Sequence, residues 1–541
     1  MRKLLPLFLA ILACKGPDKD DPAEWQKRLD SPDSKERIEA VRNLRRLKAK
    51  QAAPKVAALL KDPLVKEDAA LALQDVGSAA EIPALLDAIE TTVGSRSETE
   101  ARTTHRANTK IAEAIGDIAA QGPVDLRATE ALLRLARSKD DMVRLQAVQA
   151  LGQVKDKSAV PELSRLVDDE ATPPLIVKKA IVSLGEIGDP AAIPALEHGL
   201  VVERQGVSFF PEASFALYLI GQPAADALLK LLDDQDPQYL AWAKERDRSS
   251  AGTYAKAAIV LGDLGDPRAV APLQAKLKYT DPDPSPGTAR ILTNFVRQFA
   301  AAGLGRLRAR EAAPAIQALV STKDPQDTDL AAVASEALVL IGDRAQAREL
   351  SKKAQAGALQ GRILVARAAA LFGEPALEKE VAAIAAREEK GAPQACAKAL
   401  AELGAKLDEP KQACLGVAAR FSELSQAYEA ARACAQDTAC WTLRLKDKSE
   451  IVRTRAAFEL GRLNAAAAVP PLFEVLKDDD PDVREAGALA LQWLTANPAA
   501  REALKARLPA LNAQLSADAG KNRFLRVDEE LRRLQVKVAR L

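Results

Sequence analysis

The feature that most constrains the fold of this 541-residue chain is a degenerate repeat of about 30 to 40 residues. In its clearest pair, Gly152 and Gly185 are 33 residues apart, and so are Pro161 and Pro194. Because the two spacings agree, a whole unit has been copied rather than a single dipeptide. A unit of this length cannot bury its apolar face alone, so the sequence predicts a stack in which each unit packs on its neighbours.

Each unit is predicted to form two helices. Apolar residues recur at the three- and four-residue spacing of an amphipathic helix. Glycine is expected to end the first helix with a left-handed cap, as at Gly152 and Gly185, and proline to open the second, as at Pro161. We call the Pro-led helix A and the Gly-ended helix B.

The pattern recurs along most of the chain and weakens between about 345 and 440. Its other copies include Ala53-Pro54, Ile82-Pro83, Leu261-Gly262 with Gly265-Asp266-Pro267, Ala313-Pro314, Leu460-Gly461 and Val469-Pro470. These residues resemble HEAT-like repeats of the phycobilisome-lyase type over roughly 30–500. The resemblance implies an all-α superhelical solenoid. In such families the repeats mostly serve as protein-binding scaffolds, and a few members are enzymes.

The expected organisation follows from the repeat and the composition of the ends. We predict a signal peptide at 1–13 and a lipidated tether at 14–24. N-terminal repeats are expected at 25–345, followed by degenerate repeats with a cysteine cluster at 346–445. C-terminal repeats at 446–500 and capping helices at 501–541 complete the chain.

The first fourteen residues have the pattern of an export signal. Arg2 and Lys3 precede the apolar run 4–13, which is too short to span a bilayer. The run ends at Cys14 in a sequence that resembles a lipobox, which implies cleavage, acylation of Cys14 and a Gram-negative envelope. By the same resemblance, Lys15 favours the outer membrane, with the protein on its periplasmic or surface face. The alternative is an ordinary secretory signal cut nearby.

Four cysteines remain after Cys14, an even number that suggests two disulfides in an oxidising compartment. Three pairings are possible, and we favour Cys434–Cys440 as a local staple and Cys396–Cys414 as a clip between successive helices. A zinc site with four thiolates is the alternative, but such sites use closely spaced pairs.

The charge balance argues against nucleic-acid binding. The chain has 77 basic and 75 acidic residues, and loss of Arg2 and Lys3 leaves it formally neutral. A nucleic-acid binder normally shows a basic excess. The basic stretches 290–310 and 501–540 are expected to be solvated helix faces, or else to meet anionic lipid beside the anchor.

Candidates for catalysis are scarce. The two histidines, His105 and His198, lie in different units without a cysteine at ligand spacing, so both are expected at surfaces or helix ends. No phosphate-binding loop motif is present. We therefore predict no enzyme activity, no cofactor and no metal. A repeat-scaffold enzyme of the bilin-lyase or hydroxylase kind is the alternative, although the His-Glu pairs of HEAT-like hydroxylases are missing.

Aspartates before helix B and an arginine inside it recur along the chain. A carboxylate there can cap exposed N–H groups, and the arginine can bond it or a carboxylate of the next unit. We predict a structural role for this Asp/Arg ladder, with a ligand-reading face as the alternative. The ladder comprises Asp140, Asp141 and Arg144, then Asp447 and Arg453, then Asp480, Asp482 and Arg484.

Insertions fall on one kind of turn. B-to-A turns are short, whereas long A-to-B segments occur at 91–104, 201–210, 233–253 and 279–287. Successive turns of one kind lie along one edge of a solenoid, and insertions on one face often mark a binding face. These segments carry aromatic residues that are either protein-binding anchors or covers for their own helices, namely Phe209, Phe210, Tyr239, Trp242 and Tyr279.

The C-terminal helix has apolar residues at heptad-like spacing, at Leu531, Leu534, Val538 and Leu541. We expect it to cap the last repeat, with a partner-binding coiled coil as the alternative. Altogether the sequence predicts a non-catalytic adaptor, held to the membrane only by its N-terminal lipid, that binds another protein. Either the concave face formed by the B helices or the rim of A-to-B segments is the expected binding surface. A self-associating envelope element is the alternative, and the oligomeric state is open.

Overall fold

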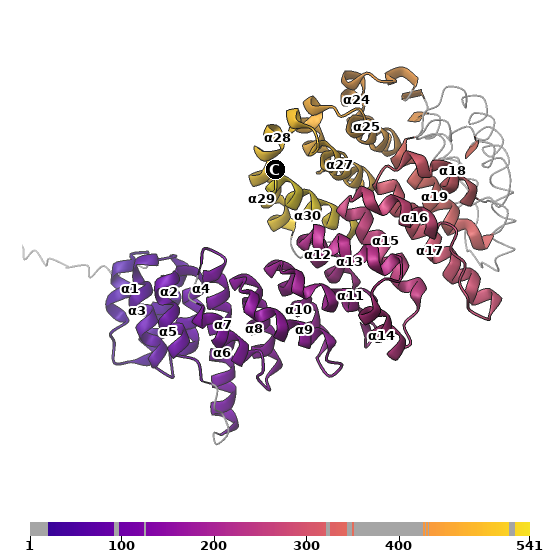
Figure 1. Cartoon of the computed structure of the whole chain (residues 1–541). Coiled ribbons are helices and arrows are strands. Elements are labelled where there is room, and N and C mark those ends of the chain that lie inside the picture. Colours follow the sequence, from indigo (N-terminus) through magenta and orange to yellow (C-terminus); the bar gives the residue numbers. More distant parts are fainter. Residues whose placement is uncertain are drawn as a thin grey trace, which may run out of the picture. The chain divides into compact units, whose positions relative to one another are not determined.

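The computed structural model describes residues 20–90, 97–123, 126–320, 325–342, 349–350, 426–427, 429–430, 432–518 and 525–541. These residues are almost entirely helical and fall into two compact units, one up to Ile220 and one from Gly221. Within each unit, short A helices form one layer and longer B helices form another, with successive helices of a layer stacked side by side (Figure 1). None of the described helices is both long and apolar enough to cross a bilayer.

The first unit contains six A–B pairs and one hairpin. Its A helices are α1 (Pro22–Arg28), α3 (Ala53–Ala58), α5 (Ile82–Asp87), α7 (Arg127–Leu135), α9 (Val160–Asp168) and α11 (Ile193–Val201). Its B helices are α2 (Ser34–Arg46), α4 (Lys66–Val76), α6 (Glu98–Ala119), α8 (Asp141–Val154), α10 (Pro174–Ile187) and α12 (Phe210–Ile220). Strands β1 (Glu203–Arg204) and β2 (Val207–Ser208) pair antiparallel between α11 and α12.

The second unit continues the same alternation. Its A helices are α13 (Gln222–Leu232), α16 (Val270–Lys276), α18 (Ala313–Leu319), α24 (Thr438–Arg444), α26 (Val469–Val475) and α28 (Pro498–Lys505). Its B layer is α15 (Ser250–Leu264), α17 (Pro286–Arg306), α19 (Thr328–Ile341), α25 (Glu450–Arg462), α27 (Pro481–Leu494) and the terminal α30 (Leu525–Ala539). The additional helices are α14 (Pro237–Glu245) and α29 (Leu508–Asp518).

Short 3₁₀ helices lie before several A helices. They are η1 (Lys50–Ala52), η3 (Ala79–Glu81), η4 (Lys157–Ala159), η5 (Pro190–Ala192), η6 (Pro267–Ala269), η7 (Arg310–Ala312) and η11 (Ala466–Ala468), while η2 (Leu59–Lys61) and η8 (Pro325–Asp327) lie before B helices.

The B-to-A turn has a common construction. Helix α10 ends at Gly188 with φ 70°, and α15 ends at Gly265 with φ 76°, a left-handed conformation that glycine adopts without steric cost. The next residue caps the 3₁₀ helix, as Asp189 does by accepting a hydrogen bond of 2.9 Å from the Ala191 N–H. The A helix then begins with proline in its first turn, where the missing N–H leaves no bond unmade.

The prediction that Gly152 and Gly185 end their helices is wrong. Both lie inside B helices, and the left-handed caps come three residues later. These glycines sit where neighbouring B helices touch. A Cβ atom on Gly185 would lie 2.8 Å from Cα of Ala216, and one on Gly262 would lie 2.8 Å from Cα of Gly303. The glycines therefore allow the close approach of successive B helices.

The terminal helix α30 closes the core of the second unit. Leu531, Leu534 and Val538 are buried in a cluster with residues of α25 and α27, such as Leu460 and Leu491. These side chains are therefore used inside the chain, which is the arrangement expected of a capping helix and leaves no open coiled-coil seam at these positions.

We expect Gly262→Ala to destabilise the second unit by about 1–3 kcal/mol, because the added methyl group meets backbone atoms of α17 that cannot move independently. Gly252→Ala in the same helix is the matched control, since a Cβ there meets nothing within 4 Å. This control should stabilise the helix by up to about 1 kcal/mol. Urea denaturation followed by circular dichroism measures both, and equal midpoints would contradict the packing role.

Candidate functional site

The predicted insertions lie on the A-to-B side of the repeats. We use the term A-to-B edge for the C-terminal ends of the A helices, the segments that follow them and the first two turns of the B helices. In the segment 91–104, residues 91–96 lie outside the described residues, and the remainder belongs mainly to α6. The other three segments are the β1–β2 hairpin, the stretch containing α14, and an extended turn before α17.

The hairpin is fixed to the preceding repeat by Arg204. Its turn residues Gln205 and Gly206 have φ values of 51° and 74°, as a tight two-residue hairpin turn requires. The Arg204 guanidinium donates hydrogen bonds of 2.5 Å to the Val167 carbonyl and 2.7 Å to the Asp169 carbonyl. Burial lowers the pKa of Arg204, which shows that this cation is partly removed from water. The hairpin is thus part of the stack rather than a free loop.

Phe209 and Tyr239 do not project from the edge. Phe209 is fully buried and lies under the Arg204 guanidinium, whose centre is 5.9 Å from the ring centroid. Tyr239 is 4% exposed, and its hydroxyl is 2.8 Å from that of Thr253. The interpretation of these two rings as accessible anchors is therefore wrong for this conformation, because they fill the space between an inserted segment and its own repeat.

The other three aromatic residues are half-buried. Trp242 packs against Tyr239 with ring centroids 5.5 Å apart. The Tyr279 hydroxyl donates to Asp281 at 2.7 Å, and burial, followed by this carboxylate, raises the pKa of Tyr279. Phe210 begins α12. Protein binding by these three residues stays a prediction, although Trp242 and Tyr279 also support their own segments.

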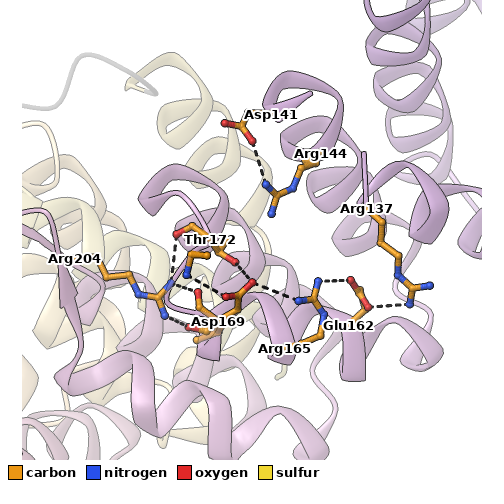
Figure 2. Close-up of polar contacts among 10 residues, drawn as sticks. Arg137, Asp141, Arg144, Glu162, Arg165, Asp169, Thr172 and Arg204 are labelled. Carbon is orange, nitrogen blue, oxygen red and sulfur yellow. Dashed lines mark hydrogen bonds and ion pairs between the residues drawn. The ribbon is translucent and has the colours of Figure 1, made fainter. Parts of the chain in front are cut away.

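Polar side chains of α9 and of the segments that follow α7 and α9 form a chain of contacts in the first unit (Figure 2). Glu162 accepts from Arg137 at 2.9 Å and from Arg165 at 2.8 Å. Burial of Glu162 would raise its pKa, but the hydrogen bonds from Arg165 and Arg137 lower it. Arg165 also reaches Asp169, which in turn accepts from Thr172 at 3.2 Å. These contacts hold neighbouring repeats in fixed register.

The Asp/Arg ladder in the first unit is local. Arg144 pairs with Asp141 at 3.1 Å one turn earlier in α8 (Figure 2). Asp140 caps the same helix by accepting from the N–H groups of Met142 and Val143, each at 3.0 Å. Both contacts are structural and use the helix start in the way the sequence predicts.

In the second unit the ladder also joins repeats. Arg453 donates to the Asp447 carbonyl at 3.0 Å and forms two bonds of 2.8 Å with the Asp478 carboxylate of the next unit. Asp480 accepts from the N–H of Asp482, and Arg484 donates to the carbonyls of Asp478 and Asp479. Arg37 and Asp62 form an equivalent pair in the first unit, with the same separation of 25 residues.

Both histidines pair with single aspartates. His198 Nδ1 lies 2.7 Å from Asp168, at the ends of two successive A helices, and His105 Nδ1 lies 3.2 Å from Asp140. Among the described residues, no group of three or more His, Cys, Asp or Glu side chains is arranged to hold a metal ion.

The predicted cysteine sites are only partly described. Cys434 and Cys440 are joined by a disulfide with Cα atoms 5.2 Å apart, which links the segment before α24 to the first turn of that helix. Cys396 and Cys414, like Cys14, lie outside the described residues. The first pair therefore has the proposed local connection, and the second pairing and the lipidation stay predictions.

The A-to-B edge carries most of the exposed large apolar side chains. The described residues include eight exposed large apolar side chains, and two of these lie elsewhere: Leu126 in a B-to-A turn and Val182 midway along α10. Met142 and Leu175 are 55% and 57% exposed and occupy the second position of α8 and α10. The six on the edge are Leu64, Met142 and Leu175 in the first unit and Leu240, Ile291 and Leu443 in the second.

The second unit contains a buried ion network that the repeat pattern did not predict. Asp263 at the end of α15 lies 2.6 Å from Arg306 Nε and 2.7 Å from Arg533. Glu530 lies 2.8 Å from Arg306 and 2.9 Å from Arg533, and accepts from Gln492 at 2.8 Å. The network joins α15, α17 and α27 to the terminal helix.

The two carboxylates of this network differ in their electrostatics. Burial raises the pKa of Asp263, and Arg306 and Arg533 oppose this shift without overcoming it. Burial would also raise the pKa of Glu530, but the same two cations and the hydrogen bond from Gln492 lower it to about 2. Asp263 and Arg306 are compensated by partners from other helices, whereas Glu530 and Arg533 also pair with each other within α30. Loss of one partner therefore leaves a buried charge.

A cavity of about 430 Å³ lies beside this network. Its lining comes from B-layer helices of the second unit, namely α15, α17, α19, α25, α27 and α30. This volume is within the range of small-molecule sites in proteins, ~300–1,000 Å³. The B-helix layer of this unit therefore encloses a binding-sized space in addition to the outer edge.

The geometry defines a class of protein: a solenoid of two-helix repeats held together by neighbour contacts. HEAT repeats match residues 22–102, 111–207 and 439–516, and the PBS lyase HEAT-like repeat matches residues 254–279 and 296–322. The chain therefore belongs to the HEAT-like repeat proteins, and the resemblance found in the sequence is confirmed. No curated protein matches it in sequence.

Solved structures similar to the chain include several helical-repeat proteins. Kap95p bound to RanGDP is 12% identical with a TM-score of 0.46, over 95% of this chain and 76% of that one. The CpcE–CpcF complex of phycocyanin lyase from Nostoc is 19% identical with a TM-score of 0.23, over 62% of this chain and 100% of that one. Human deoxyhypusine hydroxylase is 20% identical with a TM-score of 0.21, and the match covers 55% of this chain and 98% of that one.

We expect Arg306→Met to destabilise the second unit by about 3–5 kcal/mol, since it leaves Asp263 and Glu530 with one shared cation. Hydrogen–deuterium exchange should accelerate in α15, α27 and α30 while α2 to α8 are unchanged. Arg310→Met replaces an exposed arginine nearby and is the control. Equal exchange in the two variants would show that the network does not hold the terminal helix.

Proposed function

We propose that this protein is a non-catalytic adaptor of the bacterial envelope that binds another protein along its A-to-B edge. The observation that carries the proposal is the concentration of exposed apolar side chains on that edge, six of eight among the described residues. Single exposed apolar residues are common on any protein. Here three lie on the A-to-B edge of the first unit and three on that of the second. In the first unit, the equivalent positions of the successive B helices α8 and α10 are both occupied, by Met142 and Leu175.

The rigidity of the edge supports the same function. Contacts run from Arg137 through Glu162 and Arg165 to Asp169 (Figure 2). Together with the hairpin that Arg204 holds in place, they fix the segments before α8 and α10. Met142 and Leu175 lie at the starts of these two helices. A preformed surface loses little conformational entropy when a partner binds. Several charged groups at this edge, such as Arg165 with Asp169 and Arg144 with Asp141, are paired within the chain. We therefore propose that apolar contact supplies the attraction and that the polar groups form the rim.

The envelope location rests on the N-terminal sequence and agrees with the disulfide. The apolar run before Cys14 and the preceding Arg2 and Lys3 have the pattern of a lipoprotein signal. The Cys434–Cys440 bond suits an oxidising compartment such as the periplasm. A lipid at Cys14 would hold the solenoid at the membrane, which we propose to be the outer membrane.

The absence of a reaction is also part of the proposal. His105 pairs with Asp140, which caps α8, and His198 pairs with Asp168 at the end of α9, so both contacts tie repeats together. Catalysis by a histidine would need a nucleophile or metal beside the ring. The repeats alone do not decide between scaffold and enzyme, so the binding experiment below is the test of function.

We expect the double variant Met142→Glu/Leu175→Glu to lose the partner. Crosslinking and affinity capture from envelope membranes should recover a protein with the wild-type chain and at least about tenfold less with the variant, because two buried carboxylates would oppose binding. All changed side chains are exposed, so circular dichroism should be unaltered.

Leu126→Glu is the matched control for this experiment. Leu126 is 69% exposed but lies in a B-to-A turn, so this variant should capture the partner like the wild type. Undiminished capture by the double variant, or equal loss with Leu126→Glu, would contradict binding at the A-to-B edge.

Cys14→Ser should release the protein from the membrane fraction, because a serine cannot take the thioether-linked lipid. Fractionation of cells and mass spectrometry of the N-terminal peptide measure this. A wild-type peptide that begins after Cys14 without an added lipid mass would instead establish an ordinary secretory signal.

A further inference from the structure

We propose that the cavity of the second unit binds a small organic cation, an ammonium or guanidinium group on a short apolar chain. The cavity holds about 430 Å³ and is formed by B-layer helices of the second unit, and its lining contains none of the six exposed apolar residues of the A-to-B edge. The inference does not rest on the proposed function, since the two sites use different residues. It is carried by the charge of the walls, by their aromatic surface and by an unpartnered hydroxyl.

The lining has an excess of negative charge. It contains six carboxylates, those of residues 263, 336, 482, 485, 529 and 530, and two arginines, Arg306 and Arg533. Both arginines are bonded to Asp263 and Glu530 in the buried network. Among the lining residues themselves, the carboxylates outnumber the arginines by six to two. An anionic ligand is therefore disfavoured, and a cation would offset the excess.

The ionised form of Glu529, in the cavity wall, is disfavoured mainly by its burial. Burial raises the pKa of Glu529, and the neighbouring carboxylates of Asp263 and Glu530 raise it further. The Arg533 guanidinium, 3.5 Å from the Glu529 carboxylate, acts in the opposite direction and lowers this pKa. A cation in the cavity would favour the ionised form of this carboxylate and would itself be bound more tightly for that reason.

The remaining lining is suited to the apolar part of such a ligand. Phe299 and Phe458 present aromatic surface, which attracts organic cations through the ring quadrupole. Thr454 also lines the cavity and is 5% exposed, and its hydroxyl has no hydrogen-bond partner among the described residues. Buried hydroxyls are normally satisfied, so an unpartnered one at a cavity wall points to a missing polar ligand.

The direct test is isothermal titration calorimetry of the mature chain with agmatine, which carries both cationic groups on a four-carbon chain. We expect saturable binding at one site. Glu529→Gln and Glu485→Gln should each weaken it by about tenfold, because each removes one wall charge without changing shape. Glu502→Gln alters an exposed carboxylate on α28 and is the control, with unchanged affinity expected.

Two further arms separate the sources of the cation and the sites. The blocked peptide acetyl-Gly-Arg-Gly-amide should bind if the natural ligand is an arginine side chain of another protein, and only agmatine should bind if it is a free amine. Both results support cation recognition. Met142→Glu/Leu175→Glu should bind agmatine like the wild type, so failure of the edge proposal would leave this one intact. Absence of saturable binding, or equal affinity in Glu529→Gln, Glu485→Gln and wild type, would overturn it.

Discussion

The close approach of successive B helices sets the geometry of both units. At Gly185, Gly262 and Gly305 an added Cβ would lie 2.7 to 2.8 Å from backbone atoms of the next B helix, so these helices touch almost at backbone distance. Such contacts require small residues at fixed intervals, which explains why alanine and glycine recur with the repeat period. The A helices, the turns and the edges are all positioned by this one contact.

This constraint also explains where the chain varies. The B-to-A turn is short and uniform because a left-handed cap, a 3₁₀ helix and a Pro-led helix must follow one another, as at Gly188 and Gly265. The A-to-B edge takes no part in the close contact and tolerates a hairpin and an extra helix. Insertions and exposed apolar residues gather on the edge that stacking leaves free, and this makes it the proposed binding surface.

The sequence predicted the local parts of this account. Period, helix pairing, proline positions and the caps at Asp140 and Asp480 are encoded within a few residues, so pattern alone reveals them. The role of Gly152 was misjudged because a cap and a close contact both select glycine, and only the three-residue offset to the true cap distinguishes them. The burial of Phe209 and Tyr239 was likewise open, since aromatic residues suit both a core and an interface.

The network and the cavity could not be predicted in this way. Arg306 and Glu530 pair across 224 residues, and no repeat period links them. A contact between segments so far apart in the sequence is not encoded in any local pattern. The sequence signal for the network was the presence of charged residues at positions where the repeat pattern otherwise places small or apolar residues. Asp263 and Arg533 occupy such positions and are buried in B-layer helices.

The most direct test of the account is photocrosslinking in living cells with a benzophenone amino acid placed at Leu175, Val182 or Leu126 in turn. All three side chains are exposed, and they lie at the A-to-B edge, midway along a B helix and in a B-to-A turn. Binding at the A-to-B edge predicts one specific crosslinked partner from position 175 and none from position 126. The same product from 126, or products from 182 alone, would contradict it and place binding on another face.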